Sequence, residues 1–191
     1  FREKLKPGTL MSMAVASGNW TGQWLDEKPM LELLDFLNVM TYDMHGPWSA
    51  HAGYNAPLFE DPRDLEDGRG LHYQAQMDYW TQDKGWPRER LNVGIPCYGY
   101  GYAVSAWHEK PSGKSSHSEG IAFRDVPGLL ASGWKSVWDK DAAVPYLAKP
   151  GVEELISYDD EKSVNLKGAW AREQRFGGIF FWEISQDFVD G

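Results

Sequence analysis

One stretch of the chain, residues 37–46 (LNVMTYDMHG), constrains the fold more than any other. It begins as an apolar, β-branched run and ends in three polar side chains, Tyr42, Asp43 and His45. Such a run is typical of a strand buried on both faces of a parallel sheet. Its polar C-terminal end lies where α/β sheets and α/β barrels place their sites. A parallel strand can also end in polar residues without a function, so this stretch alone leaves both interpretations open.

Four segments, taken in order, resemble the catalytic domain of family 18 glycoside hydrolases, the chitinase family. They are Val-Met-Thr-Tyr-Asp followed by Gly-Pro-Trp (39–48), Gly-Ile-Pro-Cys-Tyr-Gly (94–99), Ile-Ser-Tyr-Asp-Asp followed by Ser-Val (156–164), and Gly-Gly-Ile-Phe-Phe-Trp-Glu (177–183). Any one of these motifs would be weak evidence. Four of them in the family's order and with sensible spacing indicate a resemblance over most of the chain.

The resemblance implies an α/β fold, the C-terminal half of a TIM (β/α)8 barrel with strands five to eight and an inserted small α+β domain. A typical barrel needs about 250 residues, and this chain has 191. We expect barrel segments at 1–100 and 156–191, and the insertion at 101–155, where it would form one wall of the cleft.

Local patterns predict the individual elements. The barrel strands are expected at 10–16, 36–42, 91–98 and 179–182, and the barrel helices at 24–34, 70–84 and 160–174. In the insertion we expect a helix at 123–132 and antiparallel strands at 135–138 and 143–147, with 156–158 leading back to the barrel.

Composition excludes several classes of partner. The net charge of −9 argues against a nucleic-acid partner, which selects a basic face. No apolar run is long enough to span a membrane. The single cysteine, Cys97, is expected to be an inert buried thiol. The five histidines show no zinc-type spacing, so no metal and no cofactor is predicted.

The expected chemistry is glycoside hydrolysis in which the substrate takes part. In the family that the chain resembles, the N-acetyl oxygen of the substrate attacks the anomeric carbon, and one protonated Glu acts as the acid. That Glu ends a D-x-x-D-x-D-x-E motif on strand four. The nearest string here, Asp61-Pro-Arg-Asp64-Leu-Glu66-Asp67, lacks that spacing and is predicted to be a solvated acidic loop.

The general acid is therefore not in this chain, and we expect the chain to be inactive by itself. A missing N-terminal half explains this better than lost function in an intact barrel, because strands one to four are missing with the acid.

The resemblance assigns roles to residues at two of the strand ends. Tyr42 would hydrogen-bond the acetamido carbonyl and Asp43 would orient the sugar or the acid, which makes these two the expected catalytic residues. Met40 would line the pocket under the acetamido group, and Trp182 would form its floor. Ordinary core packing is the alternative for Met40, Tyr42 and Trp182. Glu183 follows Trp182, and strand alternation points it away from the floor.

Three further aromatic residues complete the expected substrate-binding set. Trp48 stands where the family places an aromatic ring on the leaving-group side, and a packed loop tryptophan is the alternative. Tyr98 ends its strand and is expected to face the site. Tyr100 occupies a position where the family commonly carries Arg, in a Tyr-Gly-Arg string, so a phenol replaces a guanidinium that would bind sugar hydroxyls or a carboxylate.

Three functions remain open from the sequence. The chain is part of a hydrolase that cleaves β-1,4-linked N-acetylglucosamine polymers with retention, or a chitinase-like lectin without the acid, or a half barrel that pairs with another half. The Tyr42–Asp43 pair favours the enzyme. The expected ligand is chitin or a chito-oligosaccharide, and the expected location, from the resemblance only, is extracellular. Edge strands would be left unpaired, so we expect the chain alone to dimerise, aggregate or bind its missing N-terminal half.

Overall fold

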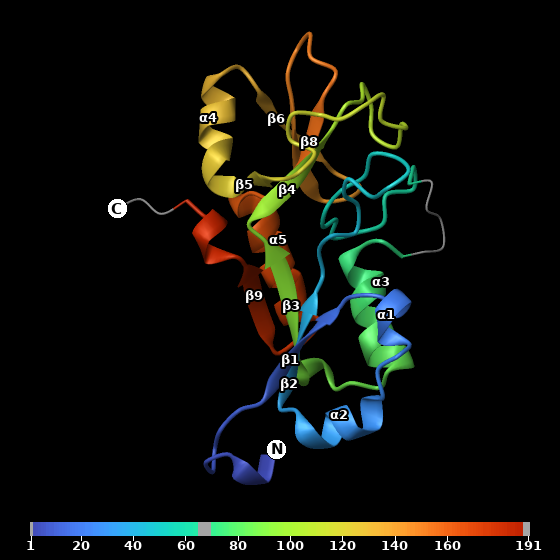
Figure 1. The fold of residues 1–191 in the computed structure, drawn as a ribbon, viewed down its shortest axis with the longest axis vertical. Helices are drawn as coiled ribbons and strands as arrows, with labels where there is room; N and C mark the ends of the chain where they lie inside the picture. Colours follow the sequence, from blue (N-terminus) through green and yellow to red (C-terminus); the bar gives the residue numbers. More distant parts are fainter. Residues whose placement is uncertain (1, 65–69, 189–191) are drawn as a thin grey trace.

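The computed structural model describes residues 2–64 and 70–188. In this part of the chain the strands form two sheets (Figure 1). One is a four-stranded sheet in the order β1-β2-β3-β9, and the other is a five-stranded sheet in the order β5-β4-β8-β7-β6. The first occupies the lower half of Figure 1 and the second the upper half.

All neighbours in the first sheet are parallel. Its strands are β1 (Ser12–Ala16), β2 (Phe36–Met40), β3 (Leu91–Pro96) and β9 (Gly178–Trp182). Helices lie between these strands in the sequence, as parallel connections require. They are α1 (Asn19–Gly22), α2 (Glu27–Leu33), α3 (Tyr73–Asp78), which continues as a π-helical turn (Tyr79–Asp83), and α5 (Glu161–Glu173). The predicted parallel strands and their order are confirmed.

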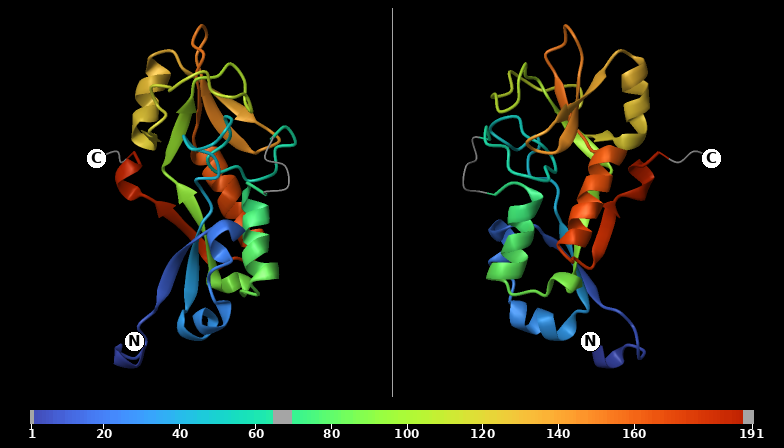
Figure 2. Two further views of the ribbon diagram at one scale, coloured as in Figure 1. Left: turned by 45° about the vertical axis from the view of Figure 1, so that its right-hand side comes forward. Right: turned by 180° about the vertical axis from the view of Figure 1, so that it is seen from behind.

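The main core lies between this sheet and the helices. Leu37 and Val39 of β2 are fully buried and belong to one apolar cluster with Trp80. The Trp80 indole Nε1 donates to the Ala16 carbonyl of β1 at 3.1 Å, which ties the helix layer to the strand edge. Helix α5 packs on β9, and the rear view shows it lying across that part of the sheet (Figure 2).

Helix α5 begins with a reciprocal cap. The Asp160 carboxylate accepts from the Ser163 amide at 2.9 Å, and the Ser163 hydroxyl accepts from the Asp160 amide at 3.0 Å. The two residues therefore cap each other reciprocally. This capping box satisfies amide groups that the first turn of a helix otherwise leaves unpaired.

The second sheet is antiparallel throughout. Its strands are β4 (Tyr98–Tyr102), β5 (Ile121–Ala122), β6 (Lys135–Asp139), β7 (Val144–Ala148) and β8 (Leu155–Ser157). Helix α4 (Val126–Ala131) follows a short 3₁₀ turn and lies beside this sheet in Figure 1. The predicted hairpin at 135–147 is confirmed. The predicted domain division at 101 and 155 stays a prediction, and the strands of this sheet extend a few residues past both of those bounds.

The two sheets meet at Cys97, and here the prediction of one strand over 91–98 is wrong. The Cys97 amide donates to the Trp182 carbonyl of β9 at 2.8 Å, while its carbonyl accepts from the Phe123 amide at 2.9 Å. One peptide unit therefore belongs to each sheet, and the chain changes sheets within a single residue. The thiol is buried, as predicted, and burial raises its pKa to about 11.

The expectation of a solvated acidic loop is wrong for its described part. Asp61 is buried and accepts from Arg63 Nε at 2.8 Å, and His108 Nε2 lies 2.8 Å from its other oxygen. Burial by itself raises the pKa of Asp61, but the hydrogen bonds from Arg63 and His108 outweigh it and hold the pKa below its ordinary value. Sequence polarity did not predict this burial, because one of the two partners, His108, lies 47 residues away in the chain. Glu66 and Asp67 lie outside the described residues.

The outer strands of the parallel sheet have one neighbour each. Apolar side chains stand exposed on these strands: Met13 of β1 is 38% exposed, and Ile179 and Phe181 of β9 are 39% and 47% exposed. Exposed apolar side chains along an edge strand are unusual for a surface that faces solvent. Within residues 2–64 and 70–188, no helix has the length and apolar character that a bilayer span requires.

Candidate functional site

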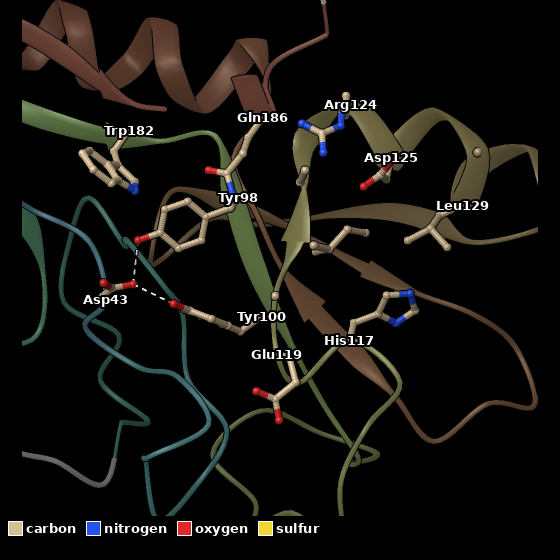
Figure 3. A pocket seen from close by; sticks show the side chains of 14 residues that line it. Asp43, Tyr98, Tyr100, His117, Glu119, Arg124, Asp125, Leu129, Trp182 and Gln186 are labelled. Atoms are coloured by element: carbon tan, nitrogen blue, oxygen red, sulfur yellow. Dashed lines mark hydrogen bonds between the residues drawn. The ribbon is translucent and has the colours of Figure 1, made fainter. Parts of the chain in front are cut away.

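A hollow of about 660 Å³ opens where the two sheets meet (Figure 3). Its wall combines residues from the C-terminal side of the parallel sheet with residues from β4, the turn before β5, and α4. Among the side chains that line it are Asp43, Tyr98, Tyr100, Arg124 and Trp182. The volume falls in the usual range for small-molecule sites, about 300–1,000 Å³.

Asp43 occupies the hollow in an unusual backbone conformation. Its φ is +61°, in the left-handed region that non-glycine residues seldom adopt. Its amide donates to the Asn55 side-chain oxygen at 2.8 Å, and the Asn55 side-chain nitrogen donates to the Tyr98 carbonyl at 3.0 Å. Asn55 is buried. It therefore joins the end of β2 to the start of β4 and stabilises the strained turn that aims Asp43.

Two tyrosine hydroxyls converge on the Asp43 carboxylate. Tyr98 donates to Asp43 Oδ1 at 2.6 Å, and Tyr100 donates to the same oxygen at 2.9 Å (Figure 3). Burial, with the neighbouring Asp43 charge, raises the pKa of both phenols above the ordinary value. Both phenols therefore remain protonated donors at neutral pH.

Tyr42 lies directly behind this cluster and does not line the hollow. Its ring centre is 6.0 Å from that of Tyr98 and 6.4 Å from that of Phe180, both edge-on. Among the described residues, its buried hydroxyl has no hydrogen-bond partner. Burial raises the pKa of this phenol, so it too stays protonated. A buried, unpartnered hydroxyl is costly unless a ligand or water completes it.

Trp182 stands at the end of β9 with its indole facing the hollow, 54% exposed (Figure 3). Trp48 lies outside the hollow but next to it, with its ring centre 5.5 Å from that of Tyr100, and is also exposed. Met40 is half-buried, packs against the main core and does not line the hollow. The structure thus groups Asp43, Tyr98, Tyr100 and Trp182, with Trp48 at the rim and Tyr42 behind.

Several lining residues were not anticipated from the sequence. They come from the turn before β5, from the 3₁₀ turn before α4 and from the short helix after β9: His117, Glu119, Arg124, Asp125 and Gln186. Arg124 brings a guanidinium to the hollow from another element, although position 100 lacks one. No local pattern in the sequence distinguishes these residues from ordinary surface charges.

The chemistry open to the described residues is binding and orientation. Asp43 accepts from two phenols, and so it acts as an acceptor in this geometry. Glu183 is exposed, accepts from the Ser185 hydroxyl at 2.5 Å and does not line the hollow, which agrees with its predicted orientation. Flat aromatic faces beside hydrogen-bonding groups suit a ligand that has both apolar and polar faces.

Comparison with protein families and known proteins gives a consistent match. The model for glycosyl hydrolases family 18 matches residues 1–187. A probable endochitinase of Caenorhabditis elegans is 32% identical over 193 residues, covering 95% of this chain and 31% of the relative. The human oviduct-specific glycoprotein is 33% identical over 199 residues, covering 98% of this chain and 28% of the relative.

Solved structures agree with the sequence match. An immunomodulatory active chitinase from Trichuris suis superposes with a TM-score of 0.84 at 31% identity, covering 93% of this chain and 51% of that one. Human YKL-39, described as a pseudo-chitinase with retained chitooligosaccharide binding properties, superposes with a TM-score of 0.86 at 26% identity, covering 97% of this chain and 53% of that one. The chain thus spans about half of these structures and under a third of the two relatives above.

Proposed function

The chain belongs to glycosyl hydrolase family 18, and from that premise we propose that it is the C-terminal half of a chitinase-like catalytic domain. Three observations support the proposal. The parallel sheet has four strands, half the number of a TIM barrel. The matched structures are about twice as long as this chain. The outer strands β1 and β9 carry exposed apolar side chains that a second half would cover.

The proposed ligand is a chito-oligosaccharide or chitin. Sugar rings of this class have apolar C–H faces and polar rims, and the hollow offers an indole face beside an oriented carboxylate. Two of the matched structures were determined with ligands of this class or its analogue, YKL-39 with a tetramer of N-acetylglucosamine and an Ostrinia furnacalis chitinase with allosamidin. The observation that carries the proposal is the convergence of Tyr98 and Tyr100 on Asp43 beside the exposed face of Trp182.

The proposed reaction is substrate-assisted retaining hydrolysis by the complete domain. In this scheme Tyr42 donates its unpartnered hydroxyl to the acetamido carbonyl, which holds that oxygen near the anomeric carbon. Asp43 accepts from the acetamido nitrogen or orients the acid. In this proposal the general acid comes from the half of the domain that precedes this chain. The extracellular location of the protein remains a prediction.

A second candidate function is a chitinase-like lectin. The specific observation in its favour is YKL-39, a structural neighbour that is described as binding chitooligosaccharides while being a pseudo-chitinase. The described residues supply binding groups and no established acid, and therefore fit both functions. The two differ in one measurable way: a lectin binds the oligosaccharide but releases no shorter product from it.

We expect an isolated 1–191 chain to self-associate at micromolar concentration, because in the described part of the chain the outer edges of β1 and β9 have no partner strand. Sedimentation velocity measures this directly. Adding the preceding half of the domain should convert the associated chain into a one-to-one complex. A stable monomer whose sedimentation does not change on that addition would contradict the half-barrel proposal.

We expect Trp182→Ala in the complete domain to weaken binding of tetra-N-acetylchitotetraose by about 10- to 100-fold, since burying an aromatic face contributes on the order of 1.5–3 kcal/mol. Isothermal titration calorimetry measures the affinity. Trp24→Ala is the matched control, because this indole is 80% exposed and does not line the hollow. Equal affinity in both variants would remove Trp182 from the ligand site.

A further inference from the structure

Three metal-ligating side chains meet in the loop that follows β2. They are His45, His51 and Asp64, and one donor atom of each lies within 4.8 Å of the others. The His51 Nε2 atom is 2.9 Å from Asp64 Oδ1, and the His45 Nε2 atom is 3.4 Å from Asp64 Oδ2. Both histidines are buried, and the Asp64 side chain is 19% exposed. No zinc-type spacing links these residues in the sequence.

His45 supplies an independent observation that points to a ligand. It is 1% exposed, and neither ring nitrogen has a hydrogen-bond partner among the described residues. Its 3.4 Å approach to Asp64 satisfies an ion-pair distance but not a hydrogen bond. A buried imidazole whose two nitrogens make no hydrogen bond carries a desolvation cost. A metal ion bound by one of these nitrogens would offset it.

The rings are held in place by the backbone around them. A Cβ at Gly53 would lie 2.3 Å from the His45 ring, so only glycine lets the loop pack flat against this imidazole. Ala52, next to His51, donates to the Glu109 carbonyl at 2.8 Å and accepts from the His108 amide at 3.0 Å. These contacts fix both histidines before any ligand binds, and such preorganisation is what a metal site needs.

From this geometry we infer a site for a divalent transition-metal ion, with zinc as the best match. Zinc binds imidazole nitrogen and carboxylate oxygen at about 2.0–2.2 Å in a tetrahedron, which places neighbouring donor atoms about 3.3 Å apart. The 2.9 Å and 3.4 Å separations above, one at each oxygen of Asp64, lie close to that value, and one donor atom from each of the three residues lies within 4.8 Å of the others. Three protein donors leave the fourth position for water, and a set of two nitrogens and one oxygen favours zinc over magnesium or calcium.

The inferred metal ion would stabilise the loop beside the hollow and would not take part in the reaction. His45 is two residues from Asp43, while His51 and Asp64 come from later in the same long loop. A bound ion would therefore cross-link the two ends of the segment that aims Asp43. This role is independent of the sugar assignment, because it rests on a separate set of side chains.

Metal removal and zinc titration test the inference. The protein is stripped with EDTA, dialysed and titrated with zinc alone, with competition against a chromophoric chelator to measure affinity and stoichiometry. We expect one zinc ion per chain and a melting temperature that rises with zinc and falls back with EDTA, because the ion binds only the folded state. Cobalt in place of zinc should give the visible absorption of a tetrahedral site.

Two variants and one control make the result specific. Outer-shell substitutions cost zinc sites about 10- to 100-fold in affinity, so His51→Gln and Asp64→Asn should each lose at least about that much. His117→Gln is the control, since His117 pairs with Glu154 at 2.9 Å outside the cluster. It should bind zinc as the wild type does. The near-ultraviolet circular dichroism of each variant verifies its fold.

Three results would overturn the inference. They are zinc uptake below one equivalent with no change in melting temperature, unchanged affinity in His51→Gln and Asp64→Asn, and an equal loss in His117→Gln. None of these measurements uses sugar or turnover, so a failure here leaves the proposed function untouched, and a failure of sugar binding leaves the metal site untouched.

Discussion

In the complete domain, Tyr42→Phe should lower kcat by about 100-fold while changing oligosaccharide affinity less than about threefold. The hydroxyl of Tyr42 is buried behind Tyr98 and has no partner among the described residues. In the proposed reaction it holds the acetamido oxygen near the anomeric carbon. Misplacing a reacting group by about 1 Å costs on the order of 100-fold in rate. Ground-state binding depends mainly on the aromatic faces, which the substitution leaves intact.

Steady-state kinetics with a fluorogenic chito-oligosaccharide gives kcat, and calorimetry on an acid-less variant gives affinity. Tyr79→Phe is the matched control. Its hydroxyl is also buried and unpartnered among the described residues, but it lies on the turn after α3, away from the hollow. Equal losses in kcat and affinity for Tyr42→Phe, or the same loss in Tyr79→Phe, would remove Tyr42 from the chemistry.

Lys167→Met should destabilise the fold by about 3–5 kcal/mol, the usual cost of breaking a buried ion pair by removing one partner. Lys167 of α5 is fully buried and bonds Asp159, which also accepts from the Ser163 hydroxyl at 2.6 Å. The ammonium lies 4.7 Å from the centre of the Tyr73 ring. Burial lowers the pKa of Lys167, and the Asp159 charge opposes that shift. The substitution keeps an unbranched side chain that is one atom shorter, and it leaves the Asp159 charge buried without its cation.

Urea unfolding of the complete domain measures this free energy. Lys162→Met on the same helix is the control: this lysine is exposed, and its ammonium lies 3.5 Å from the Trp138 ring centre, an exposed contact worth about 0.5–1 kcal/mol. The double variant Lys167→Met with Asp159→Asn should lose less than the sum of the two single losses. If Lys167→Met unfolds at the wild-type urea midpoint, the pair does not stabilise the fold.

Much of the site was predictable because its residues follow strands in a simple way. Asp43, Tyr98 and Trp182 stand at or just after the ends of β2, β3 and β9, and parallel strands bring such ends together at one edge. Tyr100 was also anticipated, and its hydroxyl reaches Asp43 from β4. Met40 and Tyr42 were expected to line the same pocket, but in the structure neither side chain lines it. Met40 packs against the core, and Tyr42 packs edge-on against Tyr98 and Phe180, so these contacts decide which side chains face the hollow.

Sequence by itself determined the local features: the apolar runs that become buried parallel strands, and the motifs whose order indicates the family. Only the tertiary structure decided which partner each loop residue finds. In the tertiary structure the chain passes from one sheet to the other at Cys97, and Asp61 is buried against Arg63 and His108. The fold also brings His45, His51 and Asp64 together. Strand and helix periodicity is encoded between neighbours, whereas the burial of a polar loop depends on donors and acceptors that lie tens of residues away.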